Sequence, residues 1–83
     1  MADYIQVFTT TGNKADAQAI ADALVAQRLA ACVQVVGPIT STYRWQGQVE
    51  TAEEWLCIAK SRSDLYEAVE RAIRAVHPYE EPE

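Results

Sequence analysis

The sequence predicts an α+β fold whose elements follow one another in the order β-α-β-β-α. Two segments carry apolar residues at helical spacing, and three others are rich in β-branched and aromatic residues. The last two strand segments flank a Gln46-Gly47 step, which is typical of a hairpin turn. With 83 residues, 49% hydrophobic and 23% charged, residues 1–83 have the size and composition of one globular domain.

The first strand and the first helix are predicted near the N-terminus. Tyr4 to Thr11 is rich in β-branched and aromatic residues, and Gly12-Asn13 then breaks the run. Asn13 can cap a helix, with Asp16 close to the positive end of the helix dipole. From Lys14 to Gln27 the apolar residues recur at spacings of three and four, which predicts a helix.

The next two strands are predicted to form one long hairpin. Cys32 to Trp45 reads as a strand that is interrupted at Gly37-Pro38, a step typical of a bulge or bend. After the Gln46-Gly47 turn, the chain is expected to return as a strand from Glu53 to Ser61, with alternating faces.

Two cysteines, Cys32 and Cys57, fall inside these predicted strands. A hairpin centred on Gln46-Gly47 leaves them out of step by about 13 Å at strand rise, which is too far for a disulfide. We therefore expect free thiols, as in a reducing cytosol.

A second helix is predicted after the hairpin. Ser61 or Ser63 is expected to cap it, and apolar residues from Leu65 to Val76 keep helical spacing until Pro78. This element order matches the split β-α-β pattern of ferredoxin-like folds. Such a fold returns one more strand, which we expect to lie beyond this chain or to come from another chain.

The predicted hairpin is longer than the helices that can cover it. Cys32 to Trp45 spans about 46 Å when extended, whereas a helix of about 14 residues reaches only about 21 Å. Tyr43, Trp45 and Trp55 are expected in the overhang. Because long apolar strands aggregate unless another subunit covers them, we expect a homo-oligomer built through the hairpin.

Charge and hydropathy exclude two classes of partner. The net charge is −5, and the seven Lys and Arg residues are scattered from Lys14 to Arg74, so no basic stripe is available for nucleic acid. The longest apolar run, Leu29 to Val33, is far below the roughly 20 residues of a membrane span, and the N-terminus has no basic region typical of a signal peptide. We expect a cytoplasmic chain without a membrane partner.

Three ordered strings resemble those of a known family. They are QRLAACV from Gln27 to Val33, STYRWQGQVE from Ser41 to Glu50, and HPYE from His77 to Glu80, followed by Pro82-Glu83. Together they resemble the CutA divalent-cation tolerance family over the whole chain. Members of that family normally continue into a further strand, so the resemblance implies a CutA-like domain that is short at its C-terminus.

The resemblance also implies an assembly and a function. It implies a ferredoxin-like subunit in a stable homotrimer, paired through long hairpins, that binds divalent metal, first of all copper, and serves in metal tolerance. The alternative is a signalling or scaffold trimer, similar to the PII nitrogen-signalling proteins, whose cleft between subunits binds a small molecule or a protein.

Three residues are candidate metal ligands: His77, Cys32 and Glu80. Neutral imidazole suits copper(II) and zinc, a thiolate suits soft metals, and the Glu80 carboxylate follows His77 by three positions. The alternatives are that His77 only ends the helix and that Cys32 is simply buried in its strand. One subunit supplies too few ligands for a tight site, and Phe8 stands where some family members carry a cysteine.

The resemblance further implies that trimer formation brings hairpin and tail together. Tyr43, Trp45, Lys60 and Tyr79 are therefore candidates for a ligand-binding cleft between subunits, and packing of the aromatic rings at the interface is the alternative. Three glutamates, at positions 50, 53 and 54, are expected to form a solvated cluster near the hairpin turn.

Catalysis is not expected. The sequence has neither a nucleophile elbow nor a phosphate-binding glycine loop, and only three glycines are present.

Overall fold

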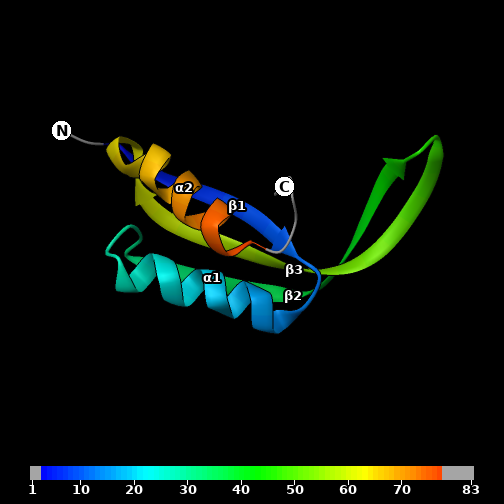
Figure 1. Cartoon of the computed structure of the whole chain (residues 1–83), viewed down its shortest axis with the longest axis horizontal. Helices are drawn as coiled ribbons and strands as arrows, with labels where there is room; N and C mark the ends of the chain where they lie inside the picture. The colour runs from blue at the N-terminus through cyan, green and yellow to red at the C-terminus, as the bar shows by residue number, and fades with distance from the viewer. Residues whose placement is uncertain (1–2, 78–83) are drawn as a thin grey trace.

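The computed structural model describes residues 3–77, in which a twisted antiparallel sheet carries two helices (Figure 1). The elements in chain order are β1 (Tyr4–Thr11), α1 (Lys14–Ala26), β2 (Cys32–Trp45), β3 (Gln48–Arg62), a 3-10 turn η1 (Ser63–Leu65) and α2 (Tyr66–Val76). Within this range the strand order is β1-β3-β2. The predicted order β-α-β-β-α and the long hairpin are confirmed.

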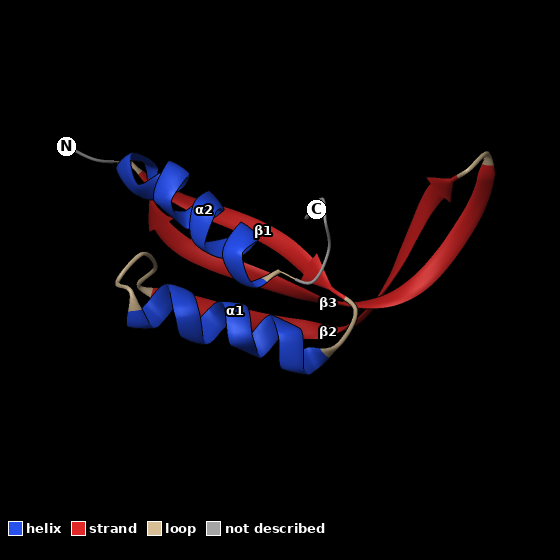
Figure 2. Ribbon diagram, viewed as in Figure 1, coloured by secondary structure: helices blue, strands red, loops and turns tan. Residues whose placement is uncertain are grey.

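The two helices cover the same part of the sheet, as Figure 2 shows. Alternate residues of β3, among them Cys57 and Ala59, point toward the helices and are buried. They pack against Ile20 and Leu24 of α1 and Val69 of α2 in one apolar cluster. The amphipathic spacing that predicts both helices therefore also identifies the residues that form the core.

The start of α1 is capped as the sequence predicts. The backbone N–H of Asp16 donates to the side-chain oxygen of Asn13 at 2.9 Å, which satisfies one of the unpaired donors of the first turn. The helix ends at Ala26, one residue earlier than predicted, because Gln27 and Arg28 already leave helical geometry.

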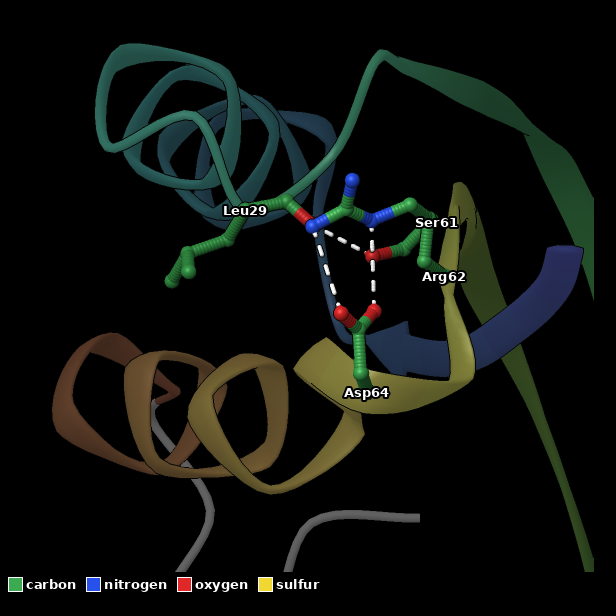
Figure 3. A network of polar contacts seen from close by, with 4 residues as sticks. All are labelled: Leu29, Ser61, Arg62 and Asp64. Carbon is green, nitrogen blue, oxygen red and sulfur yellow. Dashed lines mark hydrogen bonds and ion pairs between the residues drawn. The ribbon is translucent and has the colours of Figure 1, made fainter. Parts of the chain in front are cut away.

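The predicted cap of the second helix is wrong. Neither η1 nor α2 has a side-chain cap. The Ser61 hydroxyl instead donates to the carbonyl of Leu29, and the backbone N–H of Ser63 donates to the carbonyl of Asp3. Ser61 belongs to β3 and binds the loop after α1, so a tertiary contact takes the hydroxyl that local pattern assigns to a cap (Figure 3).

The hairpin is more regular and longer than predicted. Its return strand begins at Gln48 rather than at Glu53, so the two strands pair up to the turn, where Trp45 lies opposite Gln48. Gln46 and Gly47 have φ angles of 50° and 80°, as expected for the tight turn of a twisted hairpin. The predicted bulge is confirmed, since the register shifts between Val36 and Ile39.

Half of the hairpin extends beyond the other elements. β1 pairs with β3 only from Trp55 to Arg62, so the segment from Ile39 to Glu54 forms a two-stranded arm, the overhang (Figure 1). The molecule is 44 Å long but only 19 Å thick as a result. The predicted overhang therefore exists and carries Tyr43 and Trp45. The prediction that Trp55 lies in it is wrong, because Trp55 is paired with Thr11 of β1 and packs against the core.

The face of the sheet that carries no helix exposes several large apolar side chains. The alternate residues of β1, β2 and β3 that point to this side include Phe8, Val36, Leu56 and Ile58. Phe8 is 58% exposed and Val36 is 45% exposed. An apolar sheet face of this kind is normally covered by another layer.

Candidate functional site

His77 lies at the end of α2, buried against β1. Its backbone N–H donates to the carbonyl of Ile73 and so closes the last turn of the helix. The side chain is 8% exposed, and its Nε2 lies 2.7 Å from the carbonyl oxygen of Thr10. The ring is therefore fixed by a neighbouring strand rather than by the last carbonyls of its own helix.

The Thr10 contact defines the tautomer of His77. A carbonyl oxygen only accepts hydrogen bonds, so Nε2 must carry the proton in this contact. In the neutral ring the lone pair then lies on Nδ1, which is the atom that a metal ion requires. Histidines that bind metals commonly donate their other ring N–H to a carbonyl or carboxylate, which orients the ring.

Glu54 is a buried carboxylate that the sequence did not single out. We predict a solvated cluster for Glu50, Glu53 and Glu54, but Glu54 is only 6% exposed. It lies opposite Ile39, next to the bulge, where the overhang leaves the body of the sheet. The prediction of a solvated side chain is therefore wrong for Glu54, while Glu50 and Glu53 are exposed. The proximity of the Gly37-Pro38 step is the only local signal for this difference.

Cys32 is exposed, contrary to the alternative that its thiol is buried in the strand. It lies opposite Lys60, on the side of β3 away from β1, whereas the His77 contact Thr10 lies opposite Leu56. These positions differ by about 13 Å along β3. One subunit therefore does not bring Cys32 and His77 to the same ion, and a shared site between subunits stays a prediction.

Cys57 is a core thiol. It is 1% exposed, its Sγ lies 3.5 Å from the carbonyl of Ala17, and burial raises the pKa of the thiol above its usual value. A protonated, enclosed thiol is a poor metal ligand and a poor nucleophile. Both cysteines are free, so the predicted absence of a disulfide between them is confirmed.

The described part of the chain, residues 3–77, contains no group of three or more His, Cys, Asp or Glu side chains that could hold a metal ion. Glu80 and Tyr79, two of the predicted site residues, lie outside the described residues. His77 and Cys32 are the predicted ligands within the described range, and metal binding by either stays a prediction.

The predicted cleft residues lie far apart within one chain. Tyr43 is opposite Glu50 in the overhang, and Trp45 is 61% exposed beside the turn. Lys60 is opposite Gln6 in the body of the sheet, about 33 Å along β3 from Glu50. A cleft made of all three needs more than one subunit and stays a prediction.

Trp55 marks the junction between the body and the overhang. Its ring packs against the core, and the ammonium of Lys14 lies 5.8 Å from the ring centroid. This distance is within the range of a cation–π contact.

No helix among residues 3–77 is both long enough and apolar enough to cross a membrane.

Comparison with known proteins identifies one family. Residues 5–83 match the model of the CutA1 divalent ion tolerance protein family. The divalent-cation tolerance protein CutA of Thermus thermophilus is 42% identical over 77 residues, which cover 93% of this chain and 75% of that protein. Protein CutA of Mus musculus is 45% identical over 73 residues, which cover 88% of this chain but only 41% of the mouse protein.

The same similarity holds in three dimensions. The crystal structure of CutA from Xylella fastidiosa superposes with a TM-score of 0.94 at 38% identity, covering 98% of this chain and 78% of that one. At this level of identity and coverage, the element order and the long hairpin are those of the solved CutA structures.

Proposed function

The chain belongs to the CutA1 divalent ion tolerance protein family, and from this membership we propose that it binds a divalent metal ion, copper(II) first, in a homotrimer that serves metal tolerance. Members of this family are tolerance proteins rather than enzymes, in agreement with the absence of a catalytic motif from the sequence.

One observation carries the metal assignment. His77 is buried, and its Nε2 lies 2.7 Å from the Thr10 carbonyl oxygen, which holds the imidazole ring in a fixed orientation. Imidazole nitrogen is a good ligand for copper(II) and zinc. A ring that is oriented in advance loses less side-chain entropy when it binds an ion.

The homotrimer is supported by the surfaces that the single chain leaves open. The overhang exposes Trp45 and Val49, and the helix-free face of the sheet exposes Phe8 and Val36. Each surface thus exposes large apolar side chains in the single chain. Contacts with other copies would bury them, and other copies could supply the remaining metal ligands.

Native mass spectrometry with and without stoichiometric copper(II) tests the proposal. His77→Gln is the informative variant, because the amide can still donate to the Thr10 carbonyl while the imidazole ligand is lost. We expect a trimer that takes up discrete copper ions, and a His77→Gln trimer that has lost at least about tenfold in copper affinity. Cys32→Ser is the control for the exposed thiol, and uptake that depends on Cys32 but not on His77 contradicts the assignment.

A second function is favoured by the lack of a complete ligand set within residues 3–77. In that case the trimer is a PII-like sensor or a scaffold that binds a small molecule or a protein between subunits. Thermal unfolding in the presence of candidate ligands separates the two, because a ligand that binds only the native state raises its stability. A cytoplasmic location is likewise a proposal, and the two free thiols support a reducing compartment.

A further inference from the structure

An open cavity of about 810 Å³ lies at the end of the sheet opposite the overhang. It is bounded by the start of β1, the end of β3, and the loop between α1 and β2. Figure 3 shows the same corner, where Ser61, Arg62 and Asp64 face the Leu29 loop. Of the two candidate metal residues within residues 3–77, His77 lies toward the other end of the sheet, and Cys32 does not line the cavity.

The walls of the cavity combine apolar side chains with positive charge. The apolar part comes from Ile5, Val25, Leu29, Ala30 and Leu65. The sequence holds seven Lys and Arg residues and twelve Asp and Glu residues. Three of the basic residues, Arg28, Lys60 and Arg62, line the cavity, whereas none of its described lining residues is acidic. The whole chain has a net charge of −5, so the charge of the cavity lining is opposite in sign to that of the protein as a whole.

Two of these three cations have no carboxylate partner within residues 3–77. Arg62 is paired with Asp64, with Nε and Oδ1 3.2 Å apart, so its charge is largely balanced. The described part of the chain shows no ion pair for Arg28 or Lys60. Lys60 alternates along β3 with the buried Ala59 and Ser61, so its side chain points to the helix-free face of the sheet. Arg28 is therefore the unpaired cation on the side of the apolar lining.

The backbone of Arg28 is a second, independent observation. Arg28 has a φ of 59° and follows the C-terminus of α1. The N–H of Leu29 donates to Leu24 and that of Arg28 donates to Val25, which is the hydrogen-bond pattern of a Schellman motif. Glycine is preferred at this left-handed position because side chains strain it. Backbone strain of this kind is concentrated at functional sites, and Arg28 is one of the residues that line the cavity.

From the cavity and its charges we propose that this corner binds a small anionic amphiphile, that is, a carboxylate or a phosphate monoester on an apolar body. Arg28 binds the anionic group, and the apolar side chains contact the body of the ligand. The cavity volume lies within the range of small-molecule sites, which are likewise mostly apolar with a few polar groups that orient the ligand. This site is separate from the metal site and does not depend on it.

Calorimetry with octanoate, octyl phosphate, octylammonium and inorganic phosphate tests the proposal. We expect saturable binding of octanoate, octyl phosphate or both, with chemical-shift changes at the amides of Ala30, Ala31 and Ser61 in NMR spectra. The two anions distinguish a carboxylate from a phosphate ligand. Octylammonium has the same apolar body but the wrong charge, and inorganic phosphate has the charge but no apolar body, so both should bind at least about tenfold more weakly.

Variants assign the contacts. Arg28→Gly removes the cation and relieves the left-handed backbone, so this variant is expected to fold. Arg28→Gly should weaken binding of the anionic probe by about tenfold. Arg71→Gln, which removes an exposed charge on α2 away from the cavity, should change it by less than about twofold. The proposal is overturned if neither anion shifts the cavity amides, if octylammonium binds equally well, or if Arg71→Gln has the same effect as Arg28→Gly.

Discussion

Replacing Gly37 by alanine should destabilise the protein through one defined contact. Gly37 lies at the bulge of β2, where the chain passes over Trp55 of β3. A Cβ built on Gly37 would lie 2.7 Å from Cδ2 and Cε3 of the Trp55 ring and 3.2 Å from the carbonyl oxygen of Glu54. Carbon atoms in contact are normally about 3.5 to 4 Å apart, so the ring or the strand must move.

The cost follows from how firmly the neighbours are held. The Trp55 ring packs against the core and lies beneath Lys14, and the Glu54 carbonyl belongs to a strand that is paired on both sides of the bulge. Inserting one methyl group into packed surroundings costs about 1 to 3 kcal/mol. We expect Gly37→Ala to lower the free energy of unfolding by this amount.

A double-mutant cycle measured by urea unfolding tests the contact. Protomer concentrations must be equal, because assembly contributes to apparent stability. In a Trp55→Leu background the new methyl group has room, so Gly37→Ala should cost at least about 1 kcal/mol less than in the wild type. Gly47→Ala is the matched control, since its Cβ meets nothing within 4 Å and its cost comes only from a φ of +80°. A coupling energy below about 0.5 kcal/mol between positions 37 and 55 would refute the steric argument.

Three further predictions concern the cap of α1 and the core thiol. Asn13→Ala removes the acceptor of the Asp16 N–H and should lower stability by about 1 kcal/mol in urea unfolding, whereas Asn13→Asp should keep most of it. With a thiol reagent, exposed Cys32 should react at once and buried Cys57 only after unfolding, so equal rates would contradict the burial of Cys57. Burial raises the pKa of the Cys57 thiol above its usual value, so with rising pH the unfolded chain loses the Cys57 proton before the folded chain does. The free energy of unfolding should therefore fall as the pH rises above about 9. Cys57→Ala should make that alkaline decline shallower, and an unchanged slope would show that other groups cause it.

Local pattern was sufficient for the elements of the fold. The spacing of apolar residues predicts both helices, Asn13 is the cap that its position suggests, and the Gly37-Pro38 step is a bulge. The Gln46-Gly47 turn also gave the pairing of the hairpin up to the bulge. These features depend on residues close together in the sequence, so one sequence contains the information.

The environment of single polar side chains could not be predicted in this way. Ser61 was expected to cap a helix but donates to Leu29, which precedes it by 32 positions in the chain. Glu54 was expected in solvent and is buried, whereas Cys32 has an exposed thiol. Each outcome depends on which distant segment lies against the residue, and charge or polarity alone does not encode that. The cavity at the end of the sheet was missed for the same reason, because Arg28 and Lys60 come from segments that only the fold brings together.

The two ends of the sheet have opposite chemical character. His77 and Glu54 are buried near the start of the overhang, and the overhang itself carries the exposed carboxylates of Glu50 and Glu53. The other end carries Lys60 and the rest of the basic cavity, about 20 Å along β3 from Glu54. Direct electrostatic coupling over that distance is weak at physiological salt, where the screening length is about 8 Å. Loss of the His77 imidazole should therefore leave anion binding unchanged, and loss of the Arg28 charge should leave metal uptake unchanged. A change in one site caused by a variant in the other would instead show that the rigid β3 strand or the assembly transmits a conformational change between them.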